Sequence, residues 1–205
     1  MKTKIFLIRH AECIGNVEMK LAGRTDFELT DKGVIQAEKI ANCMKEKDLD
    51  IIYSSPLKRA KVTAEYIANY SNIKNINISS NLIEIDYGVC DGVSWQEIDE
   101  KYPYIRKNWK EIYNYPIGIP NQESFEELQS RMAKEIKHII EMHKGKTICI
   151  VSHGIAISSF LSYLYNMKFT EINKLKKQDN TAYTEIDYED NKFTIICEAN
   201  SEHLN

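Results

Sequence analysis

Residues 148–164 read ICIVSHGIAISSFLSYL, and the order of residue types in this stretch decides the fold. The run 148–151 is too short and too β-branched for a helix, so it predicts a buried strand. Ser152, His153 and Gly154 then form a polar turn, and residues 155–164 are apolar nearly all round, which is typical of a buried helix. A strand, a turn and a helix in this order form one unit of an α/β fold.

The same alternation extends along the chain. Short apolar runs predict three further buried strands, at residues 5–8, 50–53 and 75–78. Runs 182–188 and 193–197 flank the polar residues 189–192 and predict a hairpin. One helix is predicted after Thr30 and another after the capping box of Ser124 and Glu127. The apolar residues of the first helix recur at three-to-four spacing and are Ile35, Ile40, Ala41 and Met44.

We therefore expect an α/β fold, a three-layer sandwich with a mostly parallel central sheet flanked by helices. Residues 94–122 break the alternation, because they are aromatic and end in a loop with Pro116, Gly118 and Pro120. We expect them to form a small helical insertion over the active-site end of the sheet. No repeat, low-complexity tract or Gly/Ser linker divides the chain, so residues 1–205 are expected to form a single domain.

Composition excludes several classes of protein. The formal net charge is −3 and the basic residues are spread out, so we expect neither a nucleic-acid nor a membrane partner. The five cysteines are scattered without a C-x-x-C pair, which favours reduced thiols over a disulfide framework. The apolar run 5–8 is too short for a signal peptide, and no stretch approaches the length of a membrane span. A cytoplasmic location is expected.

Polar side chains follow each predicted parallel strand. Arg9 and His10 follow residues 5–8, Arg59 begins the helix after residues 50–53, and His153 follows residues 148–151. Glu84 comes a short link after residues 75–78. Ligands of open α/β sheets bind outside the carboxyl ends of the strands. Each of these residues alone is more often structural than functional, but five on one edge of the sheet indicate a site.

This set of side chains suits phosphoryl transfer. Arginine forks match phosphate oxygens, a neutral imidazole can attack phosphorus, and a carboxylic acid can protonate the leaving oxygen. Cationic side chains can offset the charge on the phosphoryl oxygens, so we expect no metal and no other cofactor. A zinc site on His10 and His153 is the competing interpretation, but neither lies in a metal-type H-x-x-x-H or C-x-x-C pair.

These residues stand in blocks that resemble the histidine phosphatase superfamily, which includes the cofactor-dependent phosphoglycerate mutases. The opening signature of that family is an apolar strand followed by R-H-G-[E/Q]-T/S and an Asn, and residues 7–16 here read LIRHAECIGN. Further blocks follow in the family's order: GRTDFELTDKGVIQA (23–37), YSSPLKRAKVTAE (53–65), LIEIDYGVCDG (82–92), NQESFEELQSR (121–131) and IVSHGIAI (150–157).

The resemblance implies a phosphatase that acts on a small phosphorylated metabolite. It implies that His10 is the phosphorylated nucleophile, and that Glu84 donates a proton to the leaving group and later activates water. The residues that it implies for binding the phosphoryl group or bordering the substrate are Arg9, Arg59, His153, Asn16, Gly154 and Gly23. Two residues depart from the signature, Ala11 in place of Gly and Cys13 in place of Thr or Ser.

Two alternative functions stand beside hydrolysis. Phosphoglycerate mutases carry a longer insertion with clustered basic residues, whereas residues 101–115 here lack a paired-arginine cluster, so hydrolysis is favoured. A non-catalytic protein that binds phosphorylated ligands would not need Glu84. Sugar phosphates, α-ribazole phosphate and phosphoglycerates all suit the sequence as substrates, and it does not specify the oligomeric state. Several aromatic residues are expected either to line a leaving-group pocket or to pack the insertion: Tyr87, Trp95, Tyr102, Tyr104 and Trp109.

Overall fold

The computed structural model describes residues 1–108 and 118–205, which include a six-stranded sheet with the order β3-β2-β4-β1-β5-β6. Its strands are β1 (Thr3–Arg9), β2 (Ile51–Ser54), β3 (Ile76–Ile78), β4 (Thr147–Ser152), β5 (Tyr183–Glu189) and β6 (Lys192–Asn200). The first four strands pair in parallel, β5 pairs antiparallel with β1, and β6 pairs antiparallel with β5. The expected α/β fold with a mostly parallel sheet is confirmed.

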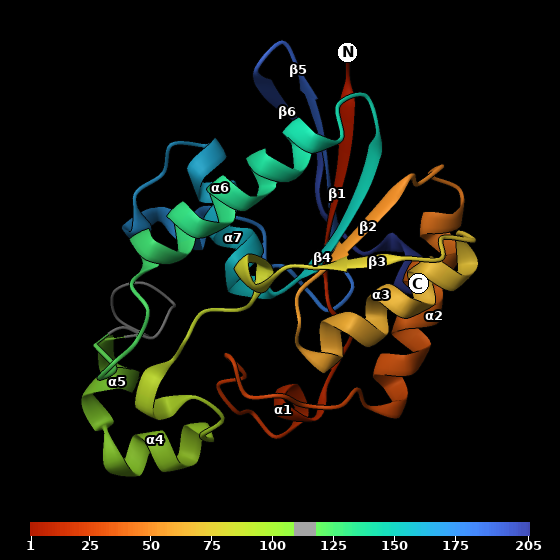
Figure 1. Cartoon of the computed structure of the whole chain (residues 1–205). Helices are drawn as coiled ribbons and strands as arrows, with labels where there is room; N and C mark the ends of the chain where they lie inside the picture. Colours follow the sequence, from red (N-terminus) through yellow and green to blue (C-terminus); the bar gives the residue numbers. More distant parts are fainter. Residues whose placement is uncertain (109–117) are drawn as a thin grey trace.

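Helices cover both faces of this sheet. The α-helices of the described residues are α1 (Ile14–Val17), α2 (Asp31–Lys45), α3 (Lys58–Tyr70), α4 (Trp95–Lys101), α5 (Pro103–Asn108), α6 (Phe125–Met142) and α7 (Gly154–Leu164). Figure 1 shows α6 and α7 on one side of the sheet and α2 and α3 on the other. Side chains of β1 alternate between the two layers: Ile5 and Leu7 pack with α6 and α7, whereas Phe6 and Ile8 pack with α2 and α3.

The predicted helix starts and the hairpin are confirmed. The Thr30 hydroxyl accepts a hydrogen bond from the Gly33 N–H at 2.9 Å, and Ser124 and Glu127 form the capping box of α6. In the hairpin, Asp190 and Asn191 have φ of 51° and 61°, the left-handed pair that a two-residue turn between twisted strands requires.

One sequence prediction was wrong in detail. Residues 75–78 were predicted as a buried strand, but β3 lies at the edge of the sheet and Ile78 is 49% exposed. In α2, Ile35 is likewise 55% exposed, although Ile40, Ala41 and Met44 of the same helix are buried. An apolar residue in a sequence pattern does not show whether another element covers it.

The predicted insertion contains α4 and α5, which lie with α1 beyond the end of β1 opposite the N-terminus (Figure 1). Ser94 and Glu97 form the capping box that begins α4. The rest of the predicted insertion includes residues 109–117, and thus Trp109, which lie outside the described residues. Within the described ranges, no helix is long and apolar enough to cross a membrane.

Candidate active site

Strand register brings the two histidines together. β1 and β4 are parallel neighbours with Arg9 opposite Ser152, so the next residues, His10 and His153, leave the sheet side by side. Their ring centroids are 5.1 Å apart, and the His10 N–H donates to the Ser152 carbonyl at 3.0 Å. Both side chains are buried, with 3% and 0% exposed. The sheet itself therefore fixes the spacing that the sequence predicted.

The hydrogen bonds of His10 determine which ring nitrogen carries the proton. Nδ1 lies 2.7 Å from the Ala11 carbonyl oxygen, which can only accept, so Nδ1 is the donor. The Arg59 Nε–H donates to Nε2 at 3.2 Å, so Nε2 is the acceptor and holds a lone pair. Burial, together with the charges of Arg59 and Arg9, keeps the pKa of His10 well below 6.5. His10 is thus a neutral imidazole with its lone pair at Nε2.

Arg59 lies in the first turn of α3 and links His10 to the loop that follows α1. Its side chain is fully buried. Nη1 donates to the Thr25 carbonyl at 2.8 Å, and Nη2 donates to the carbonyls of Ala22 and Gly23 at 2.9 and 2.6 Å. A Cβ on Gly23 would lie 2.6 Å from the Ile85 carbonyl, so only glycine allows this close approach.

A cavity of about 400 Å³ lies beside His10. Its lining includes five of the predicted site residues: Arg9, His10, Asn16, Glu84 and Gly154. Arg59, Gly23 and His153 do not line it, and Arg59 reaches the site through its contact with His10. The Arg9 Nη1 donates to the Gln178 carbonyl at 2.7 Å, and its buried Nε has no partner among the described residues. Arg9 therefore has an N–H donor that no described residue uses.

Asn16 is held so that its amide oxygen faces the protein. Oδ1 accepts from the Cys13 N–H at 3.1 Å and from the Cys13 thiol at 3.3 Å. It also accepts from the Asn180 Nδ2 at 3.2 Å, and Asn180 donates to the His10 carbonyl at 3.1 Å. The Asn16 Nδ2 is then the group available as a donor in the cavity. Sequence reasoning missed Asn180, because an Asn before the final hairpin carries no spacing signal.

Glu84 caps the N-terminus of α7. Oε1 accepts from the N–H groups of Ile85 and Ala156 at 3.0 and 2.9 Å, and Oε2 accepts from the Ile155 N–H at 3.1 Å. Burial raises the pKa of the Glu84 carboxyl, and the backbone hydrogen bonds and the Arg59 charge oppose this effect without cancelling it. A carboxyl with a raised pKa holds its proton closer to neutral pH, which suits a general acid.

His153 contacts a serine that follows β2. Its Nε2 lies 2.7 Å from the Ser55 Oγ, and Nδ1 is buried without a partner among the described residues. Burial and the charge of Arg59 hold the pKa of His153 well below 6.5. The Leu57 N–H also donates to the Ser55 Oγ at 3.4 Å, and the Ser55 hydroxyl can either donate to or accept from the His153 Nε2.

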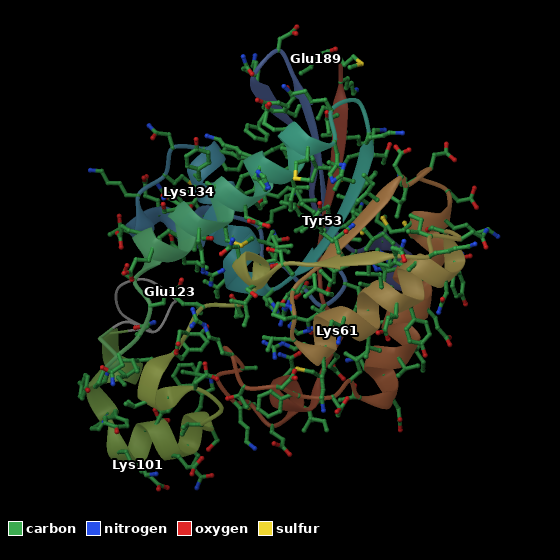
Figure 2. All side chains as sticks on the ribbon, viewed as in Figure 1. Tyr53, Lys61, Lys101, Glu123, Lys134 and Glu189 are labelled. Carbon is green, nitrogen blue, oxygen red and sulfur yellow. The ribbon has the colours of Figure 1, made fainter. Side chains whose placement is uncertain are left out.

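Arg131 of α6 fixes the segment that carries Glu84. Its guanidinium binds the Glu123 carboxylate through Nε and Nη2, at 2.6 and 2.9 Å. The same group donates to three carbonyls of the segment, those of Asn81 at 2.9 Å, Ile83 at 2.7 Å and Glu84 at 3.0 Å. Glu123, labelled in Figure 2, lies just before α6 and also pairs with Arg24 at 3.5 Å. This link between Arg131 and the Glu84 segment was not predicted from the sequence.

The departures from the family signature keep the local hydrogen bonds. The Ala11 N–H donates to the Thr63 Oγ1 at 3.0 Å, and Ala11 does not have a positive φ. Cys13 begins α1, and its thiol takes the place of a hydroxyl toward Asn16. A Cys at this position therefore still orients the Asn16 amide.

The remaining predictions have mixed outcomes. Tyr87 lines the cavity, whereas Trp95 and Tyr102 pack in the apolar core and Tyr104 is 47% exposed. Two further acidic residues follow Glu84 in the chain and have other partners: the Asp86 side chain pairs with Arg24, and Glu97 caps α4. Among the described residues, no group of three or more His, Cys, Asp or Glu side chains is placed to hold a metal ion.

Comparisons with known proteins match this chain over nearly its full length. The model of the histidine phosphatase superfamily (branch 1) matches residues 5–201. Phosphoserine phosphatase 1 of Hydrogenobacter thermophilus is 30% identical over 193 residues, which cover 94% of this chain and 90% of the relative. A probable phosphoglycerate mutase, GpmB of Escherichia coli, is 30% identical over 190 residues, which cover 91% of this chain and 86% of the relative. Among solved structures, the chain resembles a mutant phosphoserine phosphatase from Entamoeba histolytica, crystallised in complex with phosphoserine, with a TM-score of 0.83. The two sequences are 30% identical, and the match covers 99% of this chain and 100% of the other.

Proposed function

The chain belongs to branch 1 of the histidine phosphatase superfamily, and on that premise we propose that it hydrolyses small phosphate monoesters through a phosphohistidine on His10. The observation that carries the proposal is the state of the His10 ring. Nδ1–H is bound to the Ala11 carbonyl, the low pKa keeps the ring neutral, and Nε2 is left with the lone pair that must attack phosphorus. His10 is also at the wall of the cavity.

In the first half-reaction the His10 Nε2 attacks phosphorus and the bond from phosphorus to the leaving oxygen breaks. Glu84 gives its proton to that oxygen, so an alcohol leaves and a carboxylate remains. The Arg59 Nε–H, which donates to Nε2 in the free protein, turns to a phosphoryl oxygen as the new P–N bond takes the lone pair. Arg9, the Asn16 amide and the His153 ring are the further donors to the phosphoryl oxygens.

In the second half-reaction the Glu84 carboxylate takes a proton from water as the water oxygen attacks phosphorus. The P–N bond breaks, phosphate leaves, and His10 recovers its lone pair. Glu84 is thereby protonated again and ready for another cycle. Burial that raises its pKa supports both roles, because a carboxyl with a pKa nearer neutrality exchanges its proton in both directions.

A small phosphorylated metabolite is the proposed substrate. Relatives named phosphoserine phosphatase, and a relative's complex with phosphoserine, make phosphoserine the first compound to try. The relative named as a probable phosphoglycerate mutase makes isomerisation of 3-phosphoglycerate the necessary comparison. In this proposal, side chains and backbone N–H groups bind the phosphoryl oxygens of the substrate, so the reaction requires no metal.

The test is an assay of phosphate release from an aryl phosphate and from phosphoserine, with and without EDTA. We expect release in both buffers, and loss of turnover in His10→Ala to below about 1% of the wild-type rate. His138→Ala is the control, since His138 is exposed on α6. Isomerisation of 3-phosphoglycerate without phosphate release would identify a mutase. Phosphate-ligand binding with neither activity would identify a sensor, and metal-restored activity after EDTA would revive the zinc interpretation.

A further inference from the structure

The cavity carries more positive charge than one phosphoryl group uses. Besides Arg9, its lining includes three lysines, Lys20, Lys176 and Lys177, against one carboxylate, Glu84. Pockets of several hundred Å³ accommodate whole small ligands, so the cavity of about 400 Å³ has room for the leaving group as well as the phosphate. The lysines are the cations of the lining that the proposed phosphoryl site does not use.

We propose that Lys176 is the main element of a second anion subsite, so that the substrate is a phosphate monoester whose leaving alcohol carries an anionic group. The inference rests on the proposed phosphatase function, since it concerns the same cavity. A carboxylate or a second phosphate on a short carbon chain has the required chemistry, because the Lys ammonium is a compact point charge that binds either anion.

The backbone of Lys176 is held at both ends. Its N–H donates to the Glu198 Oε1 at 3.0 Å, and its carbonyl accepts from the Gln178 Nε2 at 3.1 Å. The Gln178 carbonyl in turn accepts from the Arg9 Nη1 at 2.7 Å. Gln178 thus joins Lys176 to Arg9, the arginine that is proposed to bind the phosphoryl group. The backbone from which the Lys176 side chain extends is therefore held in place before any ligand arrives.

The state of the three ammonium groups singles out Lys176. Lys20 pairs with Glu18 at 2.6 Å, and Lys177 pairs with Asp179 at 2.9 Å. Among the ion pairs of the described residues, none includes Lys176. The pair of Lys177 is solvent-exposed, with 84% and 55% of the two side chains accessible, and such pairs are weak enough to exchange partners. Lys176 is the primary anion ligand, and Lys177 can add to it.

The rest of the cavity is compatible with a short carbon chain between the two anions. Its apolar lining includes Leu21, Tyr87, Ile155, Ile172 and Leu175. Ile172 and Leu175 come from the same segment as Lys176, and the Leu175 N–H donates to the Ile172 carbonyl at 3.1 Å. One segment thus supplies both the apolar wall and the cation at its end.

The test compares matched substrates on matched variants. Glycerol 3-phosphate and 3-phosphoglycerate share a carbon skeleton, but the first ends in a hydroxymethyl group and the second in a carboxylate. Glycerol 1,3-bisphosphate carries a second phosphate in that place. We expect wild-type kcat/KM for phosphate release to be about tenfold higher for at least one of the two anionic substrates than for glycerol 3-phosphate. Lys176→Met should remove that preference through KM, because it removes the proposed anion ligand.

Lys174→Met is the control variant. Lys174 lies two residues away, pairs with Glu171 at 2.7 Å and does not line the cavity, so its loss should leave the preference intact. The preferred anion identifies the substrate class. Equal kcat/KM for all three substrates, or a preference that survives in Lys176→Met, would overturn the subsite while leaving the phosphatase standing. Absence of aryl phosphate hydrolysis in the wild type would instead overturn the proposed function on which the subsite rests.

Discussion

The carboxyl group of Glu84 is subject to two opposing effects. Burial favours its neutral form, while three backbone N–H groups favour the carboxylate, and burial dominates. If Glu84 is both acid and base, Glu84→Gln should separate the two half-reactions. An aryl leaving group needs little protonation, so we expect a burst of about one nitrophenolate per active site and then a stall, with acid-labile phosphate on His10. With an alkyl phosphate the variant should show no burst.

Asp86→Asn is the control for that experiment, because the Asp86 carboxylate pairs with Arg24 and does not line the cavity. It should keep turnover on both substrates. Gln at position 84 also places an N–H₂ group against N–H donors of α7, so a melting curve must show that the variant is folded. Equal losses on aryl and alkyl substrates, without trapped phosphohistidine, would show that Glu84 is not the acid–base residue.

Individual site residues differed in how far the sequence could predict them. His10, Arg9 and Glu84 follow strands or a short link, and strand ends at one edge of a sheet converge by geometry alone. Asn180, Gln178 and Lys176 come from an irregular segment before β5, where no periodicity or spacing marks a side chain as facing the cavity. Ser55 directly follows β2, but its contact with His153 depends on side-chain placement that the sequence does not specify.

Helix α6 acts on the site through one residue, Arg131. Because its guanidinium holds three carbonyls of the segment 81–84 and a carboxylate, a lysine cannot replace it. We expect Arg131→Lys to lower the free energy of unfolding by about 2 kcal/mol. It should also lower kcat for an alkyl phosphate about tenfold, with a smaller effect on an aryl phosphate, because misplacement of Glu84 impairs protonation of the leaving oxygen.

Lys134→Met supplies the control on the same helix. Lys134 is exposed on α6 (Figure 2), so its loss should change neither stability nor the ratio of the two activities. Stability and both activities should be measured for each variant by urea unfolding and by phosphate release. If Arg131→Lys loses stability but keeps the wild-type ratio of alkyl to aryl activity, Arg131 supports the fold and does not position Glu84.

The overall architecture followed from patterns that persist over many residues. Short β-branched runs alternate with capped helices, and this alternation allows few arrangements besides a mostly parallel sheet covered on both faces. The order of the strands was not predicted, because the sequence does not specify which parallel strands become neighbours. β3 illustrates the limit: its apolar residues match those of a buried strand, but no strand of the described residues pairs with its outer edge.

Three histidines couple the stability of the whole molecule to pH. Burial keeps the pKa values of His10 and His153 well below 6.5, and it lowers the pKa of His203 to about 4. Below pH 6.5 the unfolded chain protonates these residues while the folded chain does not. The unfolded state then binds more protons, so the free energy of unfolding must fall as the pH drops from 6.5 toward the folded pKa values. Carboxylates with lowered pKa values, such as Asp50, lose their contribution only at lower pH.

His203 allows a test of this coupling away from the cavity. It lies in the C-terminal turn Glu202–Leu204, where its Nε2 is 3.1 Å from the Thr181 Oγ1. His203→Gln can keep that hydrogen bond but cannot be protonated, so the loss of stability between pH 7 and pH 5 should shrink. We expect a reduction of about 1 kcal/mol, after allowing for solvent screening of the part-exposed ring. Urea unfolding at the two pH values measures this reduction.

The control is His138→Gln, on the exposed face of α6, which should leave the loss of stability between pH 7 and pH 5 unchanged. A loss of equal size in His203→Gln and in the wild type would show that protonation of His203 is not coupled to unfolding.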